Sequence, residues 1–88
     1  MNNTKTNLLT PEQIQEWLIS YLANLLDMDE EDIDIDEPFD RYGLDSASAV
    51  GLMGDLGTWI KQDFDPTLIY DFPTIASLSN HLISEIFK

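Results

Sequence analysis

The sequence contains no cysteine among its 88 residues, which excludes disulfides, a thiolate nucleophile and thiolate metal ligands. Any thioester would therefore need a thiol from another molecule. Residues 1–7 contain one basic residue and no apolar run follows them, so they predict neither a signal peptide nor a membrane anchor. We expect a cytoplasmic protein that does not bind membranes, with a flexible tail over residues 1–9 and one small domain over residues 10–88.

Basic residues are scarce: four stand against 17 acidic residues, which gives a net charge of −13. This charge repels the phosphates of nucleic acids and anionic lipids, so we exclude nucleic acid as a partner. It attracts proteins with basic patches. The alternative is that the acidity only keeps a small domain soluble.

The first predicted helix begins with strong start signals. Thr10 can cap it, Pro11 suits its first position and Gln13 completes a capping box. The helix is predicted to end near Leu26, and its apolar stripe consists of Ile14, Trp17, Leu18, Tyr21, Leu22 and Leu25. Residues 27–37 are too acidic to be packed throughout and predict a long loop.

A second helix is predicted from Asp45 or Ser46 to about Ile60. Its expected core face consists of Ala49, Leu52, Met53, Leu56, Trp59 and Ile60. Its other side is expected to carry Ala47, Val50, Gly51, Gly54, Gly57, Thr58 and Lys61. Three exposed glycines in one helix together lower its stability by about 2–3 kcal/mol relative to alanine, so their clustering on one face needs an explanation.

The remaining sequence predicts a short helix and a last long helix. The short helix runs through Leu68 to Tyr70 and ends before Pro73, and Thr74 caps the last helix. The apolar stripe of the last helix consists of Ile75, Leu78, Leu82 and Ile86. The predicted fold is therefore all-α: a four-helix bundle with three main helices and a short third one.

Ser46 is the candidate chemical group because it stands at a helix start, where unpaired N–H groups and the helix dipole suit a phosphate ester. The structural alternative is that Asp45 and Ser46 only cap the helix. A hydrolase with His81 as its base is disfavoured, since the chain has no G-x-S-x-G elbow at Ser46 and little room for a substrate pocket. His81 is more consistent with a surface or boundary position.

The sequence around Ser46 resembles a known family. Gly43-Leu44-Asp45-Ser46, followed by Ala49-Val50-Gly51-Leu52-Met53-Gly54-Asp55-Leu56, is similar to the phosphopantetheine attachment motif of acyl carrier proteins. Pro66-Thr67-Leu68-Ile69-Tyr70-Asp71-Phe72-Pro73-Thr74-Ile75 resembles the third-helix segment of polyketide-type carriers. The likeness covers about residues 10 to 87 and points to a free-standing acyl carrier protein.

This resemblance implies a non-catalytic monomer that holds acyl groups as thioesters on a 4′-phosphopantetheine arm at Ser46, within the motif that Gly43, Leu44 and Asp45 complete. A phosphopantetheinyl transferase would attach the arm from coenzyme A, and Asp45 would assist by helping to hold the metal ion of the transferase. Expected partners are a loading ligase of the fatty acyl-adenylate type and ketosynthase or tailoring enzymes. The alternatives are a peptidyl or aryl carrier of a nonribosomal pathway, and an unmodified carrier-like adaptor.

The chain departs from that family on the second helix, where acyl carriers usually place docking glutamates and this sequence has glycines. One interpretation is a smooth partner-docking face formed by Ala47, Val50, Gly51 and Gly54 together with Ile69 and Tyr70; the other is drift in a helix held by tertiary packing. A long acyl chain could also lie between helices, against Leu52, Met53, Leu56 and Leu68. No metal site is expected, since residues 27–38 fail the EF-hand pattern at its glycine and final glutamate positions.

Overall fold

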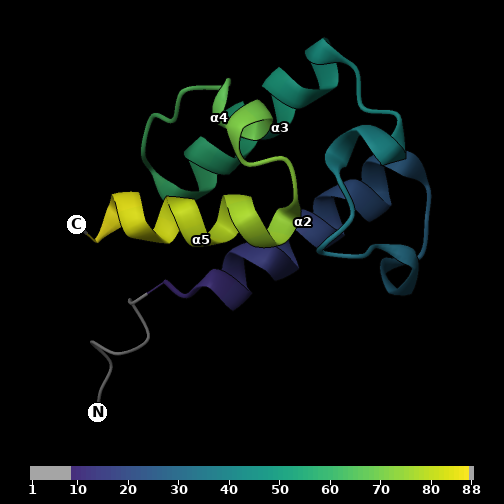
Figure 1. The fold of residues 1–88 in the computed structure, drawn as a ribbon, viewed down its shortest axis with the longest axis horizontal. Helices are drawn as coiled ribbons and strands as arrows, with labels where there is room; N and C mark the ends of the chain where they lie inside the picture. The colour runs from purple at the N-terminus through teal and green to yellow at the C-terminus, as the bar shows by residue number, and fades with distance from the viewer. Residues whose placement is uncertain (1–8, 88) are drawn as a thin grey trace.

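The computed structural model describes residues 9–87, and within this range the chain is helical with no strand. The helices are α2 (Pro11–Leu26), α3 (Ser46–Ile60), the short α4 (Leu68–Asp71) and α5 (Ile75–Ile86) (Figure 1). Two 3₁₀ turns, η1 (Glu30–Asp32) and η2 (Phe39–Tyr42), lie in the long segment between α2 and α3. This arrangement confirms the predicted all-α fold with three main helices and a short one. The predicted tail lies outside the described residues except for Leu9.

The helix starts are the residues that the sequence indicates. Thr10 caps α2 and forms a reciprocal capping box with Gln13, in which each side chain accepts a hydrogen bond from the other residue's backbone N–H. Thr74 forms the same arrangement with Ser77 at the start of α5. These caps satisfy N–H groups that have no partner inside the helix, and they fix where the chain enters each helix.

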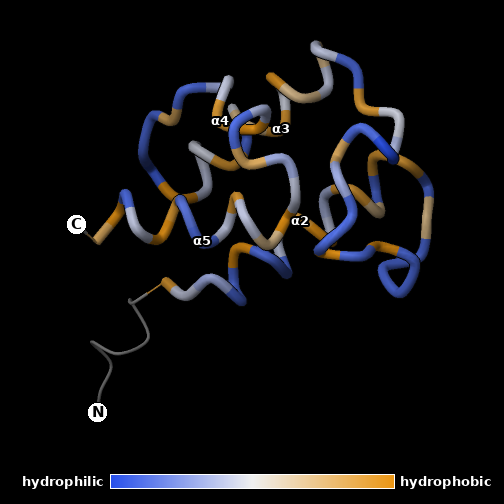
Figure 2. The backbone as a smooth tube through the Cα atoms, in the orientation of Figure 1, coloured by the Kyte–Doolittle hydropathy of each residue, from blue (hydrophilic) through white to orange (hydrophobic). Residues whose placement is uncertain are grey.

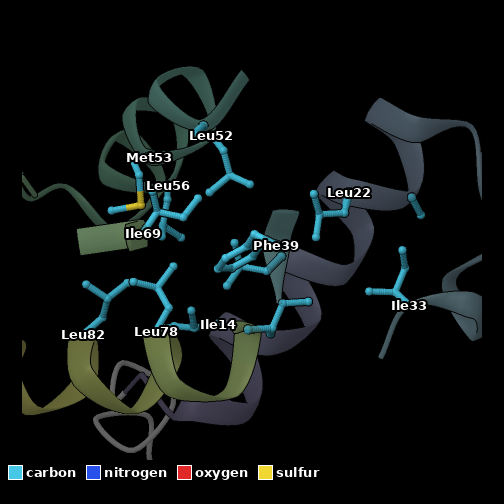
Figure 3. Packing of buried hydrophobic residues seen from close by; sticks show 14 residues of the cluster. Ile14, Leu22, Ile33, Phe39, Leu52, Met53, Leu56, Ile69, Leu78 and Leu82 are labelled. Atoms are coloured by element: carbon cyan, nitrogen blue, oxygen red, sulfur yellow. The ribbon is translucent and has the colours of Figure 1, made fainter. Parts of the chain in front are cut away.

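One hydrophobic core joins all four helices. The side chains of Leu52, Met53 and Leu56 on α3 face those of Leu78 and Leu82 on α5 (Figure 3). The helix α2 packs against α5 and contributes Ile14, Leu18 and Leu22, which are fully buried. The three long helices therefore surround a shared apolar interior, as their stripes predict.

The acidic segment between α2 and α3 is fixed to this core at a few points. Ile33 and Phe39 are buried, while most of the neighbouring residues are exposed. The segment is largely hydrophilic (Figure 2). The Phe39 N–H donates to the carbonyl of Pro73, and the Ala76 N–H donates to the carbonyl of Ile35. The loop is therefore attached to the start of α5, which determines where the chain enters α3.

The end of α3 corrects the prediction that Gly57 belongs to an exposed glycine face. Gly57 is buried, and a Cβ placed on it would lie 2.6 Å from the backbone oxygen of Gln62. Lys61 adopts a left-handed backbone with φ of 70°, and the N–H groups of Lys61 and Gln62 both donate to the carbonyl of Gly57. The chain thus folds back over Gly57, and the absence of a Cβ at this residue allows the backbone of Gln62 to come close to α3.

Within the described residues, no helix is long and apolar enough to cross a membrane.

Candidate functional site

Ser46 is the first residue of α3 and its side chain is exposed. Asp45 is the N-cap: its Oδ1 accepts a hydrogen bond of 2.8 Å from the Ser48 N–H, and its carbonyl accepts one of 2.9 Å from the Ala49 N–H. The N–H groups of Ser46 and Ala47 have no partner among the described residues. Two unpaired donors therefore stand beside the Ser46 hydroxyl, at the positive end of the helix dipole.

The segment before α3 places Ser46 at the surface. The 3₁₀ turn η2 ends at Gly43, whose φ of 75° is a left-handed conformation that glycine adopts easily. Leu44 follows and is half-buried, so it holds the chain against the domain one residue before the cap. Gly43 and Leu44 thus form the turn, and Asp45 and Ser46 begin the helix, which agrees with the order in the motif.

The Asp45 carboxylate is held in its ionised form. Hydrogen bonds from Ser48, first from its backbone N–H and then from its side chain, lower the pKa of Asp45 below its ordinary value of 3.8. The site is therefore an exposed hydroxyl next to an anionic carboxylate and two unpaired N–H groups.

Ser46 differs in its surroundings from the other serines of the described residues. The hydroxyls of Ser20, Ser77 and Ser79 form hydrogen bonds within the fold, to Glu30, Thr74 and Ile75. Ser48, also in the first turn of α3, is half-buried, and its side chain is hydrogen-bonded to Asp45. Ser84 is exposed, but it lies in the last turn of α5, at the negative end of that helix. Ser46 thus combines exposure with the positive end of a helix.

These observations fit a phosphate ester at Ser46. The unpaired N–H groups at the start of α3 can donate to phosphate oxygens, and the dipole of a helix of 15 residues favours an anion there. No neighbouring side chain covers the hydroxyl, so a long flexible group can extend into solvent.

A small hollow lies close to the site, between η2, the start of α3 and α4. It has a volume of about 200 Å³, and Leu44, Ala49 and Ile69 are among the residues that line it. Ile69, predicted to contact a partner or cargo, is only 3% exposed, while Tyr70 beside it is 62% exposed; their role in docking stays a prediction. Leu52, Met53 and Leu56, the proposed contacts of a buried acyl chain, are already closely packed in the core.

The exposed side of α3 beside Ser46 is smooth and uncharged. Ala47, Val50, Gly51 and Gly54 are all exposed, and a Cβ on either glycine would meet nothing within 4 Å. The structure thus brings four of the predicted docking residues together on one face of a helix. Their role as a docking surface stays a prediction.

An aromatic stack that the sequence patterns did not predict lies at the far end of α3. Trp17 stacks on Tyr21 with ring centroids 5.0 Å apart, and on Trp59 at 5.5 Å. Trp59 was expected in the core but is 41% exposed, because it lies on the side of α3 that faces α2 rather than α5. Leu25, expected in the stripe of α2, is likewise exposed. The sequence did contain a signal for the stack, because all three aromatic residues belong to predicted apolar helix faces.

His81 is not part of the site. Its ring stacks on Phe72 with centroids 4.0 Å apart, and its Nε2 lies 3.8 Å from Glu85 Oε2. It is half-buried, which agrees with the predicted boundary position. Among residues 9–87, no group of three or more His, Asp or Glu side chains is arranged to hold a metal ion.

Comparison with known families and proteins gives a consistent result. Residues 16–82 match the family described as "Phosphopantetheine attachment site". The chain is 35% identical over 82 residues to polyketide synthase PksL of Bacillus subtilis, a match that covers 93% of this chain and 2% of PksL. It is 47% identical over 51 residues to the acyl carrier protein TtuC of Teredinibacter turnerae, which covers 58% of this chain and 59% of TtuC. The chain thus spans a small part of PksL and less than two thirds of TtuC.

Two solved structures share the fold. A free-standing peptidyl carrier protein from a secondary metabolic pathway of Acinetobacter baumannii superposes with a TM-score of 0.81 at 35% identity, over 88% of this chain and 96% of the other. Asl1650, an acyl carrier protein of Anabaena sp. PCC 7120 with a variant phosphopantetheinylation-site sequence, gives a TM-score of 0.81 at 43% identity, over 86% of each chain.

Proposed function

The chain belongs to the phosphopantetheine attachment-site family of carrier proteins, and from this premise we propose that Ser46 is the residue that receives the 4′-phosphopantetheine arm. The observation that carries the proposal is the exposed Ser46 hydroxyl at the start of α3, beside the unpaired N–H groups of Ser46 and Ala47. The proposed carrier domain comprises residues 10–88, and the proposed setting is the cytoplasm, where coenzyme A is present.

The attachment reaction is a phosphoryl-type transfer by a partner transferase. The Ser46 oxygen forms a bond to the phosphorus that bears the pantetheine of coenzyme A, and the phosphoanhydride bond breaks so that adenosine 3′,5′-bisphosphate leaves. The hydroxyl proton passes to a base of the transferase. On this chain the N–H groups of Ser46 and Ala47 stabilise the phosphate charge, and Asp45, ionised by its hydrogen bonds from Ser48, is placed to help hold the divalent metal ion of the transferase.

The arm supplies the thiol that this cysteine-free chain lacks, and that thiol carries acyl groups as thioesters. The domain itself is proposed to catalyse no step. Its contribution is to hold the intermediate on a rigid helix end, so that each docked enzyme meets the intermediate at a high effective concentration.

Partner enzymes are proposed to dock on the uncharged face of α3 next to the arm. Ala47, Val50, Gly51 and Gly54 are exposed there, and Tyr70 lies on α4 at the rim of the adjacent hollow. The two glycines allow the backbone of a partner to come close to α3. The proposed partners of this monomer are the transferase, a loading ligase of the fatty acyl-adenylate type, and ketosynthase or tailoring enzymes.

The cargo that we propose is an acyl or polyketide intermediate. The support is the acidic Asp45 directly before Ser46 and the similarity to carrier regions of polyketide synthases. A second candidate is an aminoacyl or aryl cargo, which the 35% identity to a free-standing peptidyl carrier protein favours. Loading by acyl-adenylating and by aminoacyl-adenylating ligases, compared on the same modified protein, separates the two.

The test of the attachment site is the intact mass after incubation with coenzyme A, magnesium and a broad-specificity phosphopantetheinyl transferase. The wild type and Ser84→Ala are expected to gain the mass of one phosphopantetheinyl group, and Ser46→Ala is expected to gain none. Ser84→Ala is the matched control because Ser84 is also exposed on a helix. A mass gain in Ser46→Ala contradicts the proposal. The absence of a mass gain in the folded wild type also contradicts it and favours the alternative of an unmodified carrier-like adaptor.

A further inference from the structure

Three aromatic side chains form a continuous stack on the side of the molecule where α2 meets the end of α3. The Trp17 ring is nearly parallel to both neighbours, at 23° to Tyr21 and 14° to Trp59. The Tyr21 hydroxyl donates to Asp55 Oδ2 over 2.7 Å, which links the stack to α3. The rings are therefore held in a fixed orientation, although Trp59 remains 41% exposed.

An open groove of about 800 Å³ runs beside this stack. Leu9, Ile60 and the two tryptophans supply its apolar lining, while Glu16 and Lys61 lie at its polar edges. A groove with rigid aromatic walls and polar edges has the character of a protein-binding surface, in which aromatic anchors carry much of the affinity.

The charges around the groove are mainly negative. Glu16 is exposed and has no ion pair within the described residues; Asp55 stands at the end of the stack, and Glu30 accepts a hydrogen bond from Ser20 at the groove wall. Lys61 is the basic residue of the lining. Together with the net charge of −13, this arrangement favours a cationic partner and disfavours a second copy of this chain.

The groove is also remote from Ser46. Trp59 follows Ser46 by 13 residues of the same helix, which at 1.5 Å per residue corresponds to about 20 Å along α3. A partner bound at the aromatic end therefore leaves the start of α3 accessible.

We propose that the groove of Trp17 and Trp59 docks an amphipathic, arginine-bearing helix of a partner protein, whose apolar residues fill the groove while a guanidinium stacks on Trp59 and pairs with Glu16. Arginine suits this surface better than lysine, because its planar group stacks on an indole and forms a forked pair with a carboxylate. Such contact would keep the carrier bound to a larger assembly while other enzymes visit Ser46. The inference does not depend on which residue carries the arm.

The test uses a synthetic amphipathic peptide of roughly 16 residues, with leucines at helical spacing and two arginines on one flank. Matched peptides carry lysine or glutamate in place of arginine. Trp17 and Trp59 are the two tryptophans of the chain, so intrinsic fluorescence reports on the groove. Backbone amide shifts then locate the contact. We expect saturable binding of the arginine peptide, binding of the lysine peptide that is a few-fold weaker, and none of the glutamate peptide.

Variants of the full chain complete the test. Glu16→Arg, a surface change that leaves the core intact, and Trp59→Ala are each expected to weaken binding at least about tenfold, as amide shifts report. Val50→Ala and Ser46→Ala, on the other side of α3, are expected to bind as the wild type does. The proposal is overturned by an absence of saturable binding, by equal binding of the glutamate peptide, or by shifts that centre on Ser46. If the chain dimerises without a peptide and Glu16→Arg abolishes the dimer, the groove binds a second copy of this chain, and the proposal is also overturned.

Discussion

The strongest test of how α3 is built is a matched pair of alanine substitutions, Gly54→Ala and Gly57→Ala. Both glycines lie in the same helix, so both substitutions gain the same helix propensity, up to about 1 kcal/mol. At Gly54 the new Cβ meets nothing within 4 Å. At Gly57 it lies 2.6 Å from the backbone oxygen of Gln62, closer than two such atoms can approach.

The difference between the two variants therefore isolates the clash. Gln62 follows Lys61, whose left-handed backbone turns the chain back over α3. The N–H groups of Lys61 and Gln62 both donate hydrogen bonds to the Gly57 carbonyl. The turn cannot move away without losing these bonds, so we expect the overpacking cost of about 1–3 kcal/mol. Gly54→Ala should be more stable than the wild type, and Gly57→Ala less stable than Gly54→Ala by that amount.

Urea unfolding followed by far-ultraviolet circular dichroism measures both free energies of unfolding. In thermal unfolding, each kcal/mol corresponds to about 4–8 °C for a domain of this size. If Gly57→Ala is as stable as Gly54→Ala, the reasoning about the close approach of Gln62 is refuted. The same Gly54→Ala protein, with a bulkier Gly54→Leu beside it, also tests the docking surface, since we expect only the leucine to slow transfer of the arm.

Three further predictions concern side chains at other positions. The folded protein lowers the pKa of Asp45, so the ionised carboxylate stabilises the fold relative to Asp45→Asn. This stabilisation should be complete above the ordinary pKa of 3.8 and lost as the pH falls through the lower pKa of the folded state. Urea unfolding of both proteins at a series of pH values measures it, and a difference in stability that does not change with pH contradicts it. Burial, and then the hydrogen bond to Asp55, raise the pKa of Tyr21 to about 12. The absorbance difference between wild type and Tyr21→Phe should therefore show ionisation near pH 12, and a transition near pH 10 in that difference, with both proteins folded, argues against the bond. Lys61→Gly should stabilise the domain by about 0.5–1 kcal/mol, because glycine adopts the left-handed conformation without strain; an unchanged or lower urea midpoint would show that Lys61 makes a compensating contact.

Much of the fold was predictable because its signals are local. Thr10 and Thr74 cap helices through bonds to residues three positions later, and such spacing is visible in the sequence. The start of α3 at Ser46, with Asp45 as its cap, was predictable for the same reason. The positions of these helix starts needed no knowledge of the tertiary structure.

The errors concern residues whose surroundings depend on distant parts of the chain. A helical projection predicts on which side of α3 the Trp59 side chain lies. Whether that side is buried depends on where α2 packs, and in the structure Trp59 stacks on Trp17 and stays partly exposed. Gly57 is covered by the turn at Lys61 and Gln62, which no pattern within α3 indicates.

The central claim is that the chain holds its cargo as a thioester on an arm at Ser46. The most direct measurement is to transfer an acyl-phosphopantetheine from acyl-coenzyme A, digest the product, and identify the modified peptide by tandem mass spectrometry before and after neutral hydroxylamine. We expect the mass on the peptide that contains Ser46, with loss of the acyl group alone after hydroxylamine. Modification of any other residue, or an acyl group that resists hydroxylamine, would contradict the claim.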